Sequence, residues 1–302
     1  MSRLVKRRAA NTKLNLPDSM HPLLKRVYSQ RNINDVEELE LGLEKLIPPE
    51  QFKGINEAVQ LLIDALQRQQ RVLIVADFDA DGATSCVVAL KALRQFGFQH
   101  TDYIVPNRFD YGYGLTSEIV ELAKTRNPDL IITVDNGISS IEGVAAAKSA
   151  GIKTLITDHH LPGASAPDAD AIVNPNQHGC NFPSKSIAGV GVIFYVMLAL
   201  RAKLREMKWF EENSIAEPKL ADLLDLLALG TVADVVALDR NNRILVSEGL
   251  RRIRAGRTRP GITSLLEIAG RSSARLTASD LGFSVGPRLN AAGRLDDMST
   301  GI

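Results

Sequence analysis

The stretch VLIVADFDADGATS, residues 72–85, decides the fold prediction. Its first five residues form an apolar run of strand type, and a helical pattern follows Gly82. Between the two stand three carboxylates at alternate positions, Asp77, Asp79 and Asp81. Charges packed so closely repel one another unless a cation lies among them, so a divalent metal site is one interpretation. A solvated Asp-rich turn is the other, because Asp and Gly are common turn residues.

After residue 71, short apolar runs alternate with amphipathic segments. Strands are expected at Val72–Ala76, Asp102–Val105, Leu130–Val134, Lys153–Ile156 and Ala171–Val173. Helices are expected between them, at Ala83–Phe96, Thr116–Arg126 and Ser140–Ala150. This alternation is the βαβ signature, and it predicts an α/β fold with a parallel β-sheet flanked by helices.

The segments on either side of this alternating pattern lack predicted strands, so the chain is expected to have three parts. Residues 1–70 form a helical prelude that prolines interrupt, and residues 71–239 form the α/β domain. That domain also contains two long helices, at Ile187–Met207 and Lys219–Val232. Residues 240–302 form a helical segment whose basic residues are all arginine.

Polar side chains directly follow three of the predicted strands. Asp77 follows the first, Asp135 the third, and Asp158, His159 and His160 the fourth. Any one of them could be an N-cap or a turn residue. Because sites in parallel sheets lie beyond the carboxyl ends of the strands, all of them together predict a metal site at one edge of the sheet.

Two later features extend this site. Asp234 ends an apolar helix, where a lone carboxylate is costly unless it is paired or bound to metal; a helix-ending Asp bonded to backbone amides is the alternative. We favour the ligand interpretation, since two ions need more carboxylates than the upstream segments supply. Gly189 and Gly191, near the start of a long helix, would let its N-terminus approach an anion.

Several arginines could contact phosphate. Arg108 stands beside a glycine-containing cluster, Tyr111–Gly114, although a mobile loop explains it equally well. In the last segment the arginines outnumber the acids, which predicts a basic patch, with a solvated helix face as the alternative. The motif GPRLNAAGR, residues 286–294, places Arg288, Asn290 and Arg294 together, as a phosphate-contacting element would.

The totals describe an ordinary globular chain. It has 302 residues, 45% of them hydrophobic, and a formal net charge of +1, which neither favours nor excludes a nucleic-acid partner. Its 2 cysteines, Cys86 and Cys180, are too few for a disulfide framework and fit a reducing cytosol. No apolar segment of signal-peptide type follows the basic N-terminus.

The motifs ADFDADG, TVDNGIS, TDHH and ADVVAL, in this order, resemble the DHH phosphoesterase superfamily. With PNRFDYGYG and GPRLNAAGR, the chain is most similar to the RecJ family of bacterial single-strand-specific exonucleases. The resemblance implies two divalent ions, Mn²⁺ or Mg²⁺. The ligands that it implies are Asp77, Asp79, Asp81, Asp135, His159 and Asp234.

The resemblance also assigns roles around the ions. Asp135 would bridge them, His160 would reach the scissile phosphate, and Asp158 would orient the loop. Arg108 would act beside His160, and the substrate-binding residues would be Arg108, Arg288, Asn290 and Arg294. The family's second, DHHA1-type domain is not seen here, so residues 240–302 are read as a connector towards it and the chain as the amino-terminal part of a longer protein.

The function implied is hydrolysis of single-stranded DNA, 5′ to 3′, into 5′-mononucleotides, in DNA repair and recombination. Single-strand-binding protein and a helicase are the implied partners, with no membrane, and the protein is read as a cytoplasmic monomer. One alternative is a DHH phosphoesterase for short oligonucleotides or cyclic dinucleotides. Another is a non-catalytic replication scaffold of the same fold, which the intact carboxylates disfavour.

Overall fold

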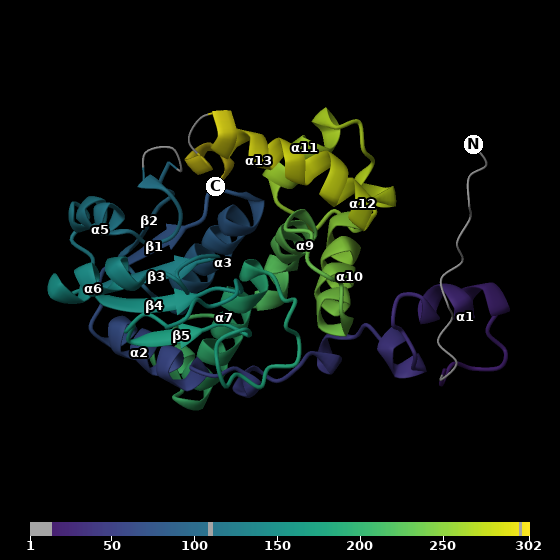
Figure 1. Cartoon of the computed structure of the whole chain (residues 1–302), viewed down its shortest axis with the longest axis horizontal. Coiled ribbons are helices and arrows are strands. Elements are labelled where there is room, and N and C mark those ends of the chain that lie inside the picture. Colours follow the sequence, from purple (N-terminus) through teal and green to yellow (C-terminus); the bar gives the residue numbers. More distant parts are fainter. Residues whose placement is uncertain (1–13, 108–110, 296–297) are drawn as a thin grey trace.

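The chain folds around one five-stranded parallel sheet (Figure 1). A computed structural model describes residues 14–107, 111–295 and 298–302. In the order in which they pair, the strands are β2 (Thr101–Ile104), β1 (Val72–Ala76), β3 (Leu130–Val134), β4 (Lys153–Thr157) and β5 (Ala171–Val173). The predicted α/β class is confirmed, and each strand lies within one residue of its predicted bounds.

Helices cover both faces of the sheet. One face packs on α5 (Ser117–Lys124) and α6 (Ile141–Ser149), and the other on α2 (Ile55–Gln67), α3 (Ala80–Phe96) and α7 (Gly189–Glu206) (Figure 1). Successive side chains of a strand point to opposite faces, so a strand between two helical layers must be apolar throughout. This explains why every residue of β1 and β3 is buried.

The order of the strands positions the site. From β1 the chain first goes to β2 on one side and then to β3 on the other, so β1 and β3 are neighbours with Ala76 opposite Val134. Connections that leave a strand pair in opposite directions create a crevice at the carboxyl ends, where such sheets bind ligands. Asp77 and Asp135 are the first residues after these two strands.

Helices continue the chain beside the sheet. After α8 (Trp209–Glu212), the predicted helix Lys219–Val232 begins as a 3₁₀ turn at Leu220–Leu223 and continues as α9 (Leu224–Ala233). The apolar side chains of α9 join the core formed by α2, α3 and α7. The last elements are α10 (Arg240–Arg254), α11 (Pro260–Ile268), α12 (Ala278–Asp280), a π-helical turn (Leu281–Val285) and α13 (Gly286–Leu295).

The first part of the chain divides in space. Helix α1 (Pro22–Ser29) lies away from the sheet, whereas α2 shares the core with β1 (Figure 1). The division of the chain into three parts, with boundaries after residues 70 and 239, stays a prediction. Both cysteines are free and buried. Across the described ranges, none of the helices combines the length and the apolar character that a membrane span requires.

Candidate metal centre

The loop between β1 and α3 sets the three alternating carboxylates. Asp79 is the N-cap of α3, and its Oδ1 accepts hydrogen bonds from the backbone N–H groups of Asp81 (2.8 Å) and Gly82 (3.0 Å). An N-cap carboxylate stabilises a helix start because the first N–H groups lack intrahelical partners. Asp77 bonds the Phe78 N–H at 2.8 Å. The alternating spacing therefore places Asp79 where it caps α3 and also brings Asp77 and Asp81 to the candidate site.

The N-terminus of α7 holds the third of these carboxylates. Asp81 is fully buried, and it accepts the N–H groups of Gly189 (2.6 Å) and Val190 (2.9 Å). The positive end of the helix dipole favours a carboxylate at this place. The anion that the glycines let this helix approach is thus the Asp81 side chain.

Asp135 lies at the centre of the crevice. Its backbone is left-handed, with φ of 63°, and its N–H donates to the Thr157 carbonyl at 3.0 Å. Asp is one of the few non-glycine residue types that adopts this conformation readily. Gly189 packs against its carboxylate so closely that a Cβ at Gly189 would come within 2.5 Å of Asp135 Oδ1. The start of α7 therefore contacts both Asp81 and Asp135.

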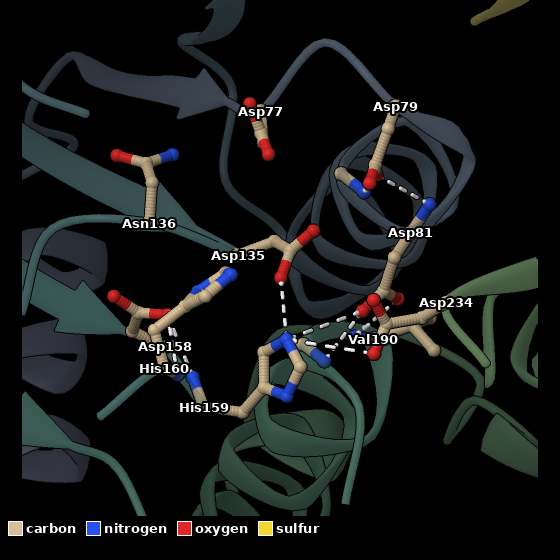
Figure 2. A network of polar contacts seen from close by, with 12 residues as sticks. Asp77, Asp79, Asp81, Asp135, Asn136, Asp158, His159, His160, Val190 and Asp234 are labelled. Carbon is tan, nitrogen blue, oxygen red and sulfur yellow. Dashed lines mark hydrogen bonds and ion pairs between the residues drawn. The ribbon is translucent and has the colours of Figure 1, made fainter. Parts of the chain in front are cut away.

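His159 points into a ring of carboxylates. Its Nε2 lies 3.1 Å from Asp135 Oδ1, 3.6 Å from Asp234 Oδ2 and 4.0 Å from Asp81 Oδ2. Figure 2 shows the imidazole between the Asp135 side chain and those of Asp81 and Asp234. Four segments, the ends of β1, β3 and β4 and the end of α9, thus supply ligand atoms to one small space.

The donor set fits divalent cations. Three buried atoms, Asp135 Oδ1, His159 Nε2 and Asp234 Oδ2, make no hydrogen bond within the described residues. Unpartnered buried polar atoms are costly, so their convergence indicates a ligand. Ligand atoms lie within 4.8 Å of one another in three overlapping groups: Asp77 with Asp79 and Asp135, Asp81 with His159 and Asp234, and Asp135 with His159 and His160.

Burial and mutual repulsion perturb the titration of these groups. Burial, aided by the charge of Asp79, raises the pKa of Asp77 to about 7. Burial and then neighbouring carboxylates raise the pKa values of Asp81 and Asp135 well above the usual range. Burial lowers the pKa of His159, which leaves its imidazole neutral and able to ligate a metal. A bound cation would favour the charged forms of these carboxylates.

His160 belongs to a second network, beside the carboxylate ring. Its Nδ1 lies 2.7 Å from Asp158 Oδ1, a hydrogen bond that raises the pKa of His160. Asp158 is buried and also accepts the N–H groups of Ile138 (2.8 Å), His159 (2.7 Å) and His160 (3.1 Å). Burial alone would raise the pKa of Asp158, but these hydrogen bonds lower it. Asp158 therefore orients both histidines and stays charged.

Helix α13 packs against the segment that joins β1 to α3. Asn290 Oδ1 accepts the Ala80 N–H at 2.7 Å, and a Cβ at Gly293 would come within 2.3 Å of the Phe78 carbonyl oxygen. The side chain of Asn290, which was expected to bind substrate, thus bonds the start of α3 through its oxygen. Arg288 donates to the Ser284 carbonyl at 2.7 Å, and Arg294 is exposed in the last turn of α13. Arg108 lies outside the described residues.

The expected basic patch is largely engaged within the molecule. Arginines of residues 240–302 form ion pairs with Glu38, Asp222, Asp225, Glu248 and Asp280; they are Arg243, Arg252, Arg259, Arg251 and Arg271. Arg254 bonds the Leu276 carbonyl at 2.7 Å. These arginines have partners within the molecule, and the phosphate-binding surface expected of this segment stays a prediction.

Two contributors were missed from the sequence. The close approach of Gly189 to Asp135 joins positions far apart along the chain and has no local signature. Tyr113 stands over the site: its hydroxyl lies 3.2 Å from the Asp135 carbonyl oxygen and from His160 Nδ1. The motif that contains Tyr113 was noted only for its glycines and its neighbouring Arg108.

Comparisons with known proteins agree with this geometry. The family model described as "DHH family, N-terminal domain" matches residues 71–231. The single-stranded-DNA-specific exonuclease RecJ of Salmonella typhimurium is 56% identical over 99% of this chain, which spans 52% of that relative. The chain thus covers about half the length of the curated relatives it matches.

Solved structures give the same result. A crystal structure of exonuclease RecJ bound to manganese matches with a TM-score of 0.70 and 33% identity, covering 83% of this chain and 60% of that one. RecJ from Thermus thermophilus in complex with Mn²⁺ matches with a TM-score of 0.72 and 30% identity, covering 91% of this chain and 37% of that one.

Proposed function

Because the chain belongs to the DHH family, we propose that it forms the catalytic centre of a metal-dependent exonuclease that hydrolyses single-stranded DNA. Its similarity to RecJ over nearly its whole length supports this substrate, and the manganese-bound relatives support the cofactor. We further propose the 5′-to-3′ direction, release of 5′-mononucleotides and action in the cytoplasm as a monomer. Single-strand-binding protein and a helicase would be its partners in repair and recombination.

One observation carries the proposal. Asp135 belongs to two of the three ligand groups, and His159 links Asp135 to Asp81 and Asp234. Overlapping groups of this kind suit two neighbouring ions, and in two-metal hydrolases the ions lie about 3.5–4 Å apart. We assign Asp77 and Asp79 to one ion, Asp81, His159 and Asp234 to the other, and Asp135 to both. Carboxylate and imidazole ligands suit Mn²⁺ and Mg²⁺.

Side chains near the metal ligands are proposed to bind and orient the scissile phosphate. Two divalent ions held by the metal ligands would supply a more acidic bound water and stabilisation of charge on the phosphoryl oxygens. Asp158 holds His160 through Nδ1, and we propose that Nε2, which lies 3.3 Å from the Tyr113 hydroxyl, faces the substrate. The raised pKa of His160 favours the protonated form, which would add positive charge beside the scissile phosphate. Arg108 and Arg294 are proposed to contact phosphates of the strand.

A metal titration tests the proposal. Mn²⁺ is added to the metal-free protein, and nucleotide release is followed from a labelled single strand, a duplex, a short dinucleotide and a cyclic dinucleotide. We expect release from the single strand that depends on Mn²⁺ and disappears in Asp135→Ala. Asp168→Ala, at an exposed carboxylate that pairs with Lys148, is the matched control and should keep wild-type activity.

The same titration separates the alternatives. Faster cleavage of the dinucleotide or the cyclic dinucleotide than of the long strand would replace the exonuclease with a small-substrate phosphoesterase. Metal binding without hydrolysis of any substrate would favour the scaffold.

A further inference from the structure

One face of α13 lies along segments that supply proposed metal ligands. Gly286, Asn290 and Gly293 share this face, because residues three and four positions apart are neighbours on a helix. At the start of α13, a Cβ on Gly286 would come within 3.0 Å of the Ala233 Cβ. Ala233 is the last residue of α9 and directly precedes Asp234. The start of α13 is thus packed against the segment of one proposed ligand.

The other end of this face meets the segment that joins β1 to α3. A Cβ on Gly293 would come within 2.3 Å of the Phe78 carbonyl oxygen, so the two backbones approach each other closely. Phe78 lies between Asp77 and Asp79 in the sequence. Over ~10 Å of helix, α13 therefore extends from the segment of Asp234 to the segment that carries the first proposed ligands.

Asn290 makes a polar contact in the middle of this face. The first N–H groups of a helix lack intrahelical partners. At the start of α3, the Asp79 side chain accepts those of Asp81 and Gly82. Asn290 Oδ1 accepts the N–H of Ala80, between two proposed ligands, at 2.7 Å. Ala80 is 1% exposed, so solvent has little access to this N–H group.

We propose that Asn290 is a positioning residue of the metal centre, which holds Asp79 and Asp81 in the arrangement that the ions require. The inference rests on the proposed function and deepens it, because it assigns the side chain of Asn290 to the metal ligands and not to the strand. This role needs only the acceptor oxygen of the side chain, whereas binding of a phosphate needs the amide N–H groups. The two roles can therefore be separated by substitution.

The test removes the oxygen of Asn290 in one variant and keeps it in another. Mn²⁺ binding to the metal-free protein, without nucleic acid, is measured by calorimetry. Asn290→Leu leaves the Ala80 N–H buried without a partner, so affinity should fall about 10- to 100-fold, as for other supports of metal ligands. Asn290→Asp keeps the acceptor and adds a negative charge, so its affinity should be at least that of the wild type.

Two glycine variants test the close approach of the backbones. Gly293→Ala places a Cβ within 2.3 Å of the Phe78 carbonyl oxygen, so one of the two segments must move and Mn²⁺ affinity should fall. Gly261→Ala in α11 is the matched control, because a Cβ there meets no atom of the described residues within 4 Å. Thermal unfolding in a chelator is measured for every variant. A role in stability alone would lower Tm and leave the affinity for Mn²⁺ unchanged.

Two results would overturn the inference. One is wild-type affinity for Mn²⁺ in Asn290→Leu or in Gly293→Ala, whatever the Tm. The other is an equal loss of affinity in Asn290→Leu and Asn290→Asp, which would mean that the acceptor oxygen is not what Asn290 contributes.

The calorimetry separates this inference from the proposed function, because it requires no hydrolysis. If no strand is cleaved but affinity falls in Asn290→Leu and is kept in Asn290→Asp, the exonuclease fails and the positioning role stands. If strands are cleaved and Asn290→Leu binds Mn²⁺ as the wild type does, the positioning role fails alone. A wild-type protein that binds no Mn²⁺ would overturn both.

Discussion

At the residue scale, the two adjacent histidines have different surroundings. His159 faces three carboxylates through Nε2, whereas His160 is bound to Asp158 and stands beside Tyr113. His159→Ala should lower metal affinity by about 100-fold or more, and high Mn²⁺ should partly restore the rate. His160→Ala should lower kcat by about 10²–10³-fold with little change in metal affinity. Nucleotide release measured across a Mn²⁺ titration would show the difference, and superimposable curves would refute this division of roles.

Asp77 gives the metal-free protein a pH dependence. Its pKa is about 7 in the folded state because of burial and Asp79, against 3.8 for the ordinary carboxyl. Between these values the folded state binds more protons than the unfolded state, so stability falls as pH rises. The stability is fully present below pH ~3.8 and is lost as pH rises through ~7. Thermal unfolding in a chelator should show Tm falling across this window.

Asp77→Asn should reduce the fall of Tm with rising pH, and Asp81 and Asp135, whose pKa values are also raised, should maintain the rest. Asp168→Asn, at an exposed carboxyl, is the control and should leave the slope unchanged. A Tm that rises with pH in the metal-free wild type would contradict the assignment.

At the element scale, α7 places its N-terminus against two proposed ligands. Gly189→Ala would put a Cβ within 2.5 Å of Asp135 Oδ1, so Asp135 or the helix must move. We expect metal affinity to fall about 10- to 100-fold, as for other displaced supports of a metal site. Gly191→Ala meets only the Ile187 side chain, so it should cost about 1–3 kcal/mol of stability and keep metal affinity. Calorimetric Mn²⁺ titration of both variants decides the matter, and equal affinities would contradict the close-approach argument.

The elements also show what the sequence could and could not predict. Strands such as Val72–Ala76 and Leu130–Val134 were predicted with their observed bounds, because burial on both faces makes them continuous apolar runs. The edge of the sheet to which Asp77 and Asp135 belong followed from the order of strands and helices. The bond from Ala80 to Asn290 spans 210 positions and depends on tertiary packing. No local pattern carries such information, and the same holds for the pairing of Arg259 with Asp225.

At the scale of the whole molecule, the metal centre joins the carboxyl edge of the sheet to α3 and α9, which belong to the same helical layer. The proposed ligands come from the ends of β1, β3, β4 and α9, so metal binding requires all of these segments to be folded together. A ligand that binds only the folded state stabilises it by mass action, by about 2.7 kcal/mol at 100 times its dissociation constant. Mn²⁺ should therefore raise Tm by several degrees.

Thermal unfolding with and without chelator measures this stabilisation. Asp135→Asn should lose the Mn²⁺-dependent rise, whereas the metal-free variant should be at least as stable as the metal-free wild type, because the amide tolerates the left-handed backbone and one repelling carboxylate is gone. A full Mn²⁺-dependent rise in the variant would place the ions elsewhere.

The proposed ligands lie far apart in the sequence, so the ribosome synthesises them at different times. A ribosome adds about 5–20 residues per second, so Asp234 is made roughly 10–30 s after Asp77. During that interval the nascent chain carries the first carboxylates without α9, and Asp81 lacks the N–H groups of α7 until that helix has formed. The complete metal centre can therefore form only after α9 has been synthesised and has packed against α3. Until then the nascent chain lacks one of the proposed ligands, so capture of the ions follows the packing of these helices.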